Sequence, residues 1–365
     1  MSYRVPPQPG GLERHVECLT REQIARGHRV TMAFRHGTTV PTGAVKLPLR
    51  ASALSRGLTR LSDRTAFAAE AAAAIRRLSR RPGPHVPDLV HVHGDHVEAM
   101  WLAPLCRRLG IPLFLTVHGR LSDGHRRLAR RAFRYVDAFI ALGSGTRTDL
   151  LGCAVPERRI LTMSSGLDLS RMPPPADTGR ERGLIVSVGS LDPVKNHGLL
   201  IEAFHDLVRT RPGLRLVIAG EGPERDRLAA LAAAGPGVEL AGALPRGHVY
   251  ELVRRAEVFV LASRRLPGKG EGVPTAALEA LALGTPVVVS SEASLAPVVA
   301  DGTYRVFHSG ARADLVATLR ALLDDASARG QMSDLGRQAA AELGWPAVAG
   351  RVEDCYAAAL GRHCT

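Results

Sequence analysis

Short apolar runs alternate with longer amphipathic stretches along the whole chain. Runs of about four to eight apolar or β-branched residues that end in small or polar residues are typical of buried strands. Two series of such runs are predicted strands: residues 29–34, 88–93, 112–117, 138–142 and 160–163, and then residues 184–188, 214–219, 238–240, 258–261 and 286–290. Helical stretches separate most of them, among them residues 11–26, 196–210, 224–233 and 275–283. This alternation predicts an α/β protein with parallel sheets and helices on both sheet faces.

A polar, proline-rich segment separates the two series of strands. Its sequence, Met172-Pro-Pro-Pro-Ala-Asp-Thr-Gly-Arg, is typical of a linker. We therefore expect two doubly wound domains, residues 1–172 and 173–344, and a C-terminal helix within residues 345–365 that packs back on the first domain. In such sheets ligands bind beyond the carboxyl ends of the strands, and two facing domains place the ligand in a central cleft.

The beginning of the first domain departs from this pattern. A domain of this type opens with a buried strand, whereas here the chain reaches Gly10-Gly11 only a few residues after Met1. We therefore expect the first strand to be missing or truncated.

Composition describes a globular protein of the cytoplasm. The hydrophobic content is 45% and the mean hydropathy is near zero. We find no apolar run long enough to span a bilayer and no signal sequence. The five cysteines are scattered and lack Cys-x-x-Cys spacing, which favours reduced thiols over a disulfide framework or a zinc knot.

The net charge of +13 comes almost entirely from arginine, because lysine occurs only at Lys46, Lys195 and Lys269. Pairs such as Arg107-Arg108, Arg126-Arg127 and Arg130-Arg131 suit either solvated helix faces or contact with anionic lipid headgroups and acidic substrates. We favour solvated faces. Nucleic acid is not an expected partner, because aromatic residues make up only 4% and do not interleave with the basic runs.

Three segments have the residue types of an anion and sugar site. Gly10-Gly11 opens a helix, where backbone N–H groups and the helix dipole favour negative charge. Lys195 follows a predicted strand and supplies the compact ammonium suited to a diphosphate. Glu271 and Glu279 lie about two helical turns apart, so both carboxylates can face one cleft and accept hydrogen bonds from sugar hydroxyls. A plain loop–helix junction, a surface lysine and solvated glutamates are the alternatives.

A fourth segment has the spacing of a binuclear zinc hydrolase. Its candidate ligands are His91, His93, Asp95 and His96. Hydrolases of this type have a β-sandwich core, whereas strand–helix alternation surrounds the motif here. We therefore keep the zinc hydrolase as an alternative and expect no metal site.

The order of motifs resembles the group 1 family of retaining glycosyltransferases, which have two Rossmann-like domains (the GT-B architecture). The resemblance covers nearly the whole chain. Its motifs are the Gly-Gly segment before Arg14, residues 26–30, Thr116-Val-His-Gly119, Ser165-Gly-Leu-Asp168, Lys195-Asn196, Gly220-Glu-Gly-Pro223 and Glu271-Gly-Val-Pro…Glu279. The last motif, two glutamates separated by seven residues, is specific to the family, and the others are weaker but occur in the expected order.

This resemblance implies a metal-independent, retaining transfer from a nucleotide sugar, which is a substrate rather than a cofactor; UDP is favoured over GDP. It implies His118, Lys195 and Glu271 as catalytic residues. His118 would contact the transferred sugar, Lys195 would offset the diphosphate charge, and Glu271 would hold the sugar hydroxyls. Glu279 would bind the ribose. The other expected donor contacts are Gly10, Gly11, Ser190, Gly222, Gly272 and Val273.

One position departs from the family pattern. Members usually have an arginine five residues before the lysine, where this chain has Ser190. We hypothesise that Arg264, Arg265 or Lys269 supplies the missing cation.

The acceptor stays open at this point. Arginine-rich helices suit a lipid-linked or cell-envelope acceptor, with peripheral contact at the inner face of the membrane. A soluble metabolite such as an aminocyclitol natural product is the second candidate. A non-catalytic sugar-nucleotide-binding protein is a further alternative, which the presence of both glutamates, His118 and Lys195 disfavours.

Overall fold

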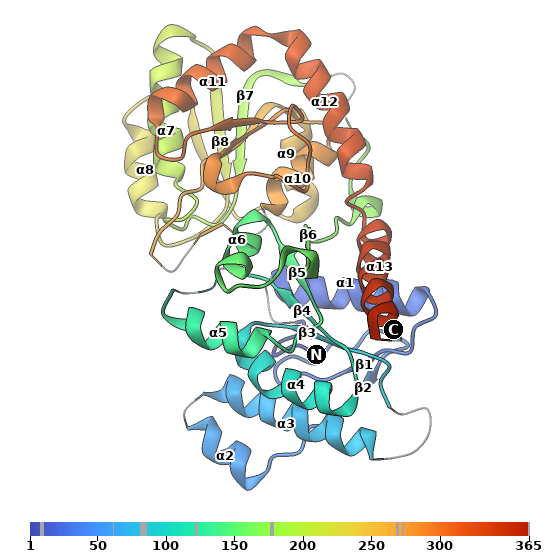
Figure 1. The fold of residues 1–365 in the computed structure, drawn as a ribbon. Coiled ribbons are helices and arrows are strands. Elements are labelled where there is room, and N and C mark those ends of the chain that lie inside the picture. The colour runs from blue at the N-terminus through green and yellow to red at the C-terminus, as the bar shows by residue number, and fades with distance from the viewer. Residues whose placement is uncertain are drawn as a thin grey trace. The chain divides into compact units, whose positions relative to one another are not determined.

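The computed structural model describes residues 1–7, 11–60, 62–80, 86–119, 121, 123–175, 179–267, 270–271 and 274–363. These residues form two compact units, each with its own parallel sheet (Figure 1). The first unit contains Met1–Gly166 together with Trp345–Thr365, and the second contains Leu167–Gly344. The division precedes the expected boundary at residue 172, because Leu167 already pairs with Gly344 in the second unit.

The first unit is built on a four-stranded parallel sheet. In spatial order its strands are β3 (Val90–His93), β4 (Leu113–Val117), β5 (Ala138–Leu142) and β6 (Ile160–Met163). A two-stranded parallel sheet contains β1 (Thr31–Met32) and β2 (Val45–Lys46). The helices are α1 (Gly11–Ala25), α2 (Ala53–Thr59), α3 (Asp63–Ser79), α4 (His96–Leu109), α5 (Arg126–Phe133), α6 (Ser144–Gly152) and α13 (Trp345–His363). Helix α13 packs against α1, as the red and blue helices of Figure 1 show.

The central strands of this unit are apolar throughout because both sheet faces are covered. Every residue of β4 and of β5 is buried, as continuous hydrophobic runs in a parallel sheet predict. The expected strand at 29–34 is wrong in length: β1 covers only Thr31–Met32. The short Met1–Val5 segment pairs with neighbouring chain through isolated bridges, from Ser2 to His93 and from Arg4 to His36.

The second unit contains a six-stranded parallel sheet. In spatial order its strands are β12 (Arg305–Phe307), β11 (Val287–Ser290), β10 (Ala256–Leu261), β7 (Glu181–Val188), β8 (Arg215–Ala219) and β9 (Val238–Gly242). Its helices are α7 (His197–Thr210), α8 (Arg225–Ala233), α9 (Arg246–Arg255), α10 (Thr275–Ala282), α11 (Arg312–Asp324) and α12 (Ala326–Ala341).

Alternate residues of the second sheet enter two separate cores. Val186 and Phe259 pack in the core that includes α9 and α10. Ile185 and Val258, one position earlier in each strand, pack in the core that includes α7 and α11. The expected doubly wound arrangement is confirmed in this unit. Sequence reasoning missed β12, a three-residue edge strand with only one buried residue.

No helix among the described residues is long and apolar enough to cross a membrane.

Candidate functional site

The carboxyl ends of β7 and β10 bring two of the expected site residues together in the second unit. The chain winds outward from β7 to β8 and β9 on one side, and to β10, β11 and β12 on the other. The winding direction therefore reverses between β7 and β10. Such a switch point leaves a crevice at the strand ends, where ligands of doubly wound sheets bind. Lys195 follows β7 and Glu271 follows β10.

Lys195 and Glu271 form the central ion pair of this crevice. The Nζ atom of Lys195 donates to both carboxylate oxygens of Glu271, at 2.7 and 2.8 Å. Ser263, just after β10, donates its hydroxyl to one of these oxygens at 2.5 Å. The Glu271 side chain is only 7% exposed and that of Lys195 is 21% exposed. The ammonium group is therefore fixed in position and still reaches solvent.

The loop that carries Lys195 is shaped by a local turn and by Arg264. The side chain of Asp192 accepts from the backbone N–H of Val194 at 3.0 Å, and Lys195 donates its own N–H to the Asp192 carbonyl at 2.9 Å. Arg264 donates its backbone N–H to Val194 at 2.7 Å and its Nε to the Pro193 carbonyl at 2.9 Å. These two hydrogen bonds from Arg264 stabilise the conformation of the loop that carries Lys195.

The other two cations hypothesised to replace the family arginine are placed differently. Arg265 is exposed, and Lys269 lies outside the described residues. Ser190 itself is exposed next to the loop.

Glu279 has two partners that sequence analysis did not identify. Arg246 and Tyr250, both in α9, contact the same carboxylate oxygen; the tyrosine hydroxyl donates at 3.3 Å. Burial raises the pKa of the Glu279 carboxyl, and the charge of Arg246 opposes that effect. Glu279 remains 15% exposed. Within the protein, an arginine and a tyrosine are therefore the partners of this partly buried glutamate.

The glycines of the expected site have different surroundings. A Cβ at Gly222 would lie 2.6 to 2.8 Å from the backbone of Leu191, so the loops after β7 and β8 pack backbone against backbone there. Gly11 begins α1, is exposed, and has open space around its Cβ position. Gly10, Gly272 and Val273 lie outside the described residues.

In the first unit His118 belongs to a cluster of three imidazoles. His93 Nδ1 and His118 Nε2 are 3.1 Å apart, and the ligand atoms of His15, His93 and His118 all lie within 4.8 Å of one another. His15 and His93 are buried, and His118 is half-buried. Burial, followed by the neighbouring histidines, lowers the pKa of His118 well below its usual value. The rings are therefore neutral at pH 7.

The structure does not bring the four residues of the alternative zinc hydrolase motif together as one ligand set. Asp95 caps α4 through the Val97 N–H at 2.9 Å and pairs with Arg64 at 2.8 Å. His91 contacts Thr116 and Tyr356. Only His93 of the motif belongs to the metal-competent group found among the described residues. His91 and His93 share one face of β3 and their rings stack at 4.3 Å, but both ring nitrogens of His91 are engaged by Tyr356 and Thr116. Asp95 is engaged in capping α4. The ligand set of the hydrolase alternative was therefore wrong.

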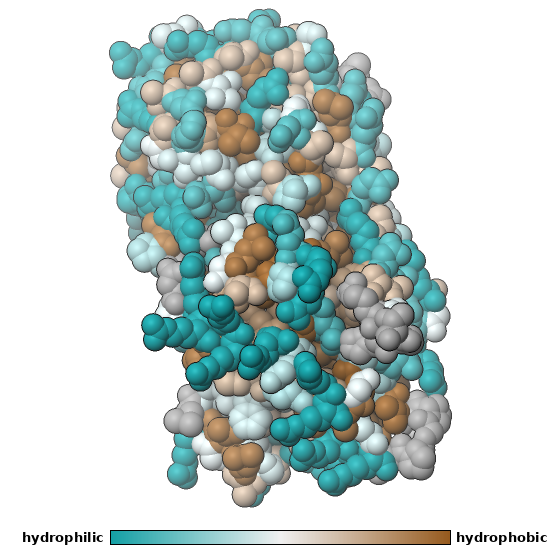
Figure 2. Space-filling view, viewed as in Figure 1, coloured by the Kyte–Doolittle hydropathy of each residue, from teal (hydrophilic) through white to brown (hydrophobic). Residues whose placement is uncertain are grey.

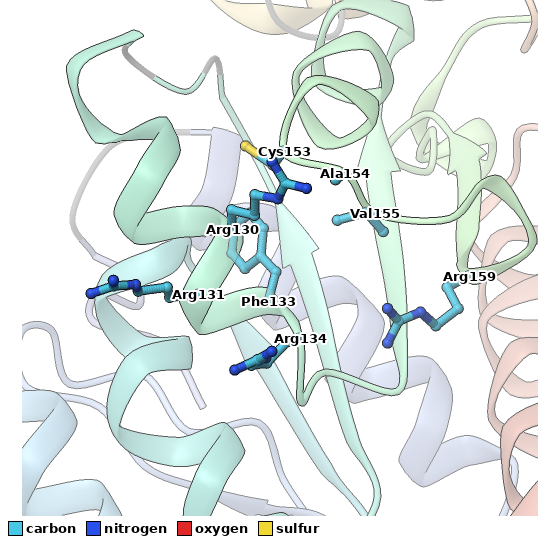
Figure 3. A pocket seen from close by; sticks show the side chains of 8 residues that line it. All are labelled: Arg130, Arg131, Phe133, Arg134, Cys153, Ala154, Val155 and Arg159. Carbon is cyan, nitrogen blue, oxygen red and sulfur yellow. The ribbon is translucent and has the colours of Figure 1, made fainter.

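A basic pocket of about 370 Å³ lies in the first unit, at the end of the sheet opposite to that of His118. Its lining residues are Arg130, Arg131, Phe133, Arg134, Cys153, Ala154, Val155 and Arg159 (Figure 3). The end of α5 just before β5 and Arg159 just before β6 place it at the amino ends of these strands, whereas His118 follows the carboxyl end of β4. Figure 2 shows a strongly hydrophilic surface over α5.

Sequence reasoning missed several residues that complete these arrangements. Arg246 and Tyr250 lie 33 and 29 residues before Glu279. Ser263 lies 8 residues before Glu271. No spacing rule links these residues to the carboxylates they contact. The members of the histidine cluster could be placed more easily. His15 lies one helical turn after Gly11. His93 pairs with Thr116, which lies two residues before His118. The adjacency of His93 and His118 could have been inferred from neighbouring strand ends.

Comparison with known proteins gives consistent results over both units. The family described as "Glycosyl transferases group 1" matches residues 174–339, and "Glycosyltransferase Family 4" matches residues 9–171. The glycogen synthase of Mycobacterium tuberculosis is 29% identical over 98% of this chain and 94% of its own length. The D-inositol 3-phosphate glycosyltransferase of Geodermatophilus obscurus is 33% identical over 79% of this chain and 70% of its own.

Solved structures share the fold. The structure of Anabaena Alr3699/HepE in complex with UDP aligns with a TM-score of 0.73 at 14% identity, covering 98% of this chain and 99% of that one. This likeness confirms the expected fold class, two Rossmann-like parallel-sheet domains of the GT-B type.

Proposed function

Because the chain belongs to the group 1 family of glycosyltransferases, we propose that it transfers a hexose-type sugar from a nucleoside diphosphate donor to an acceptor hydroxyl, with retention at the anomeric carbon. UDP is the proposed nucleotide, supported by the fold likeness to a protein solved with UDP. The observation that carries the proposal is the Lys195–Glu271 pair at the switch point of the second sheet.

The proposed chemistry of this pair is electrostatic. An ammonium group has three N–H donors, and two hydrogen bonds to Glu271 leave one for a phosphate oxygen. As the bond to the anomeric carbon breaks, negative charge grows on the leaving diphosphate, and a positioned cation stabilises that charge. Glu271 accepts hydrogen bonds from the sugar hydroxyls. Its contacts with Lys195 orient the carboxylate before the donor arrives.

The remaining donor contacts are proposed from the family resemblance together with local geometry. Glu279 binds the ribose hydroxyls; its second carboxylate oxygen supports this, since Arg246 and Tyr250 both contact the first. Gly11 suits the diphosphate because α1 begins there with exposed backbone. His118 contacts the transferred sugar.

Transfer is proposed to need no metal. Lys195 supplies positive charge at the diphosphate, and the sequence contains no Asp-x-Asp motif. Retention places the acceptor on the same face as the leaving group, so the departing phosphate is the proposed base toward the acceptor hydroxyl.

Two acceptor classes have support. The basic pocket beside α5 supports a lipid-linked or cell-envelope acceptor at an anionic surface, because arginines bind phosphate well. The name of the Geodermatophilus relative supports a soluble cyclitol phosphate. Vesicle co-sedimentation at low and high salt separates them: salt-sensitive binding to anionic vesicles, lost on replacing Arg130, Arg131 and Arg134 by glutamine, supports the first class only.

The donor is tested by thermal unfolding with a panel of UDP-, GDP- and ADP-linked sugars in the presence of EDTA. A ligand at 100 times its Kd stabilises the folded state by about 2.7 kcal/mol. We expect UDP sugars to raise Tm in the wild type and much less in Lys195→Ala. If no nucleotide sugar raises Tm and none is hydrolysed, the proposal is overturned. A shift with GDP sugars alone corrects the base.

A further inference from the structure

Three imidazoles from separate elements meet at one point of the first unit. His15 comes from α1, His93 ends β3, and His118 follows β4. Their ring centroids are 4.9 Å apart for His15 and His118, and 5.4 Å apart for His93 and His118. Three converging histidines exceed what one proposed sugar contact at His118 requires.

We propose that His15, His93 and His118 form a binding site for a divalent d-block metal ion such as Zn²⁺, with a fourth coordination position left open. Zinc–imidazole bonds of about 2.0–2.1 Å in tetrahedral geometry place two ligand nitrogens about 3.4 Å apart. His93 Nδ1 and His118 Nε2 are already 3.1 Å apart, and all three ligand atoms lie within 4.8 Å of one another. Small side-chain shifts would complete the site.

His15 has a ligand atom that the protein leaves unused. Its Nδ1 lies 2.7 Å from the hydroxyl of Ser165, while its buried Nε2 has no hydrogen-bond partner among the described residues. A hydrogen bond at one ring nitrogen fixes the tautomer and directs the lone pair of the other nitrogen, as in protein zinc sites. An unpaired buried nitrogen is otherwise unfavourable.

The surroundings select the class of ion. Imidazole ligands without a carboxylate suit zinc, copper, nickel or cobalt rather than magnesium or calcium. Burial lowers the pKa of His15 to about 4 and that of His93 well below its usual value, so the lone pairs are available at pH 7. His118 is half-buried, which gives an ion a route to the cluster.

A bound ion would inhibit transfer, a consequence that rests on the proposed function. If His118 contacts the transferred sugar, coordination removes that contact. A bound metal ion would then reversibly inhibit an enzyme that is proposed to need no metal for turnover. The binding site itself does not depend on this consequence, so the two are tested by separate readouts.

Binding is measured on the full chain by Co²⁺ titration, followed through the visible d–d absorption, and by Zn²⁺ competition with a chromogenic chelator. We expect one tight site. The variants His15→Gln and His93→Gln should each lower the affinity at least tenfold, and Ser165→Ala, which keeps all three ligands, should lower it about tenfold. His96→Asn is the matched control, because His96 belongs to the same sequence motif but lies outside the cluster.

Several outcomes decide the matter. Loss of affinity in the cluster variants with an unchanged His96→Asn supports the site. No saturable binding, an unchanged His15→Gln, or an equal loss in His96→Asn overturns it, and the three imidazoles are then a packed, neutral group. If Zn²⁺ binds and sugar transfer is unaffected, the inhibitory consequence fails while the site stands. If EDTA-treated enzyme is inactive and Zn²⁺ restores it, the inhibitory consequence is wrong in sign.

Discussion

Lys195 and Glu271 lie 76 residues apart, yet the ammonium contacts both oxygens of the carboxylate. The pair joins the loops that follow β7 and β10, the two strands between which the winding direction reverses. A ligand phosphate that approaches Lys195 therefore meets a carboxylate at the same point. Because the two side chains are in direct contact, a substitution of either residue also tests the role of the other.

Glu271→Gln keeps the size of the side chain and removes its charge. Because the carboxylate orients Lys195 and is proposed to hold the sugar hydroxyls, we expect kcat to fall on the order of 10²-fold. Steady-state kinetics with the best donor measure the change. Glu292→Gln, at an exposed glutamate, should behave as the wild type. Equal kcat values for both variants would remove Glu271 from the proposed mechanism.

Glu279→Gln should weaken recognition of the ribose. A hydrogen bond to a charged group contributes about 1.5–3 kcal/mol, so the preference for UDP over 2′-deoxy-UDP should fall roughly tenfold or more. Competition binding of the two nucleotides measures that preference. Tyr250→Phe, which removes the 3.3 Å contact to Glu279 and the acceptor of the Arg246 Nε–H but leaves the glutamate in place, should have a smaller effect. Undiminished discrimination in Glu279→Gln would assign the ribose to other residues.

Combined and single substitutions test the hypothesis that Arg264, Arg265 or Lys269 supplies the cation missing at Ser190. Arg264→Ala, Arg265→Ala and Lys269→Ala combined should raise KM for the donor at least about tenfold, as loss of one charge-assisted phosphate contact implies. Arg265→Ala alone isolates the exposed guanidinium, because Arg264 also holds the Pro193 carbonyl. An unchanged KM in the triple variant would dispose of the hypothesis.

Gly222→Ala should destabilise the protein by about 1–3 kcal/mol. The new Cβ would meet the Leu191 backbone at 2.6 to 2.8 Å, and backbone atoms give way only when the loops move. Gly247→Ala is the control: it lies within α9 with open space around its Cβ, where alanine is the better helix former. Urea unfolding compares them. A neutral Gly222→Ala would mean that the two loops separate easily.

The buried His197 makes stability depend on pH. Burial, followed by the charge of Lys195, lowers its pKa from 6.5 to about 4. Below pH 6.5 the His197 imidazole is protonated in the unfolded chain, whereas in the folded chain it is protonated only near pH 4 and below. The free energy of unfolding therefore falls with decreasing pH across this window, by up to about 1.4 kcal/mol per pH unit.

Removal of the imidazole isolates this contribution. His197→Asn should lose stability less steeply than the wild type as the pH decreases, because asparagine does not titrate. Thermal melts at intervals across the window provide the comparison. Parallel curves for the two proteins would show that His197 is protonated equally in the folded and unfolded states.

Local patterns predicted the sheets well and the contacts between distant residues poorly. Buried strands such as β5, and β10 after Glu257, have unbroken apolar sequences. Within each parallel sheet, the carboxyl ends of the strands could be placed at one edge from topology alone. Marginal edge strands such as β12 have too few buried residues to produce a period. The partnership of Glu279 with Arg246 depends on how α9 and α10 pack, which no spacing within either helix specifies.

The path of the chain also has a consequence for biosynthesis. The second unit, Leu167–Gly344, is inserted within the sequence of the first, whose helix α13 follows it. Gly166 and Trp345, the residues that flank the insertion, are in close contact: a Cβ at Gly166 would lie 2.4 Å from the indole ring. On the ribosome the inserted unit is complete before α13 emerges. Synthesis of the first unit therefore begins first but is completed last. Helix α1 lacks its partner α13 until that helix has been translated.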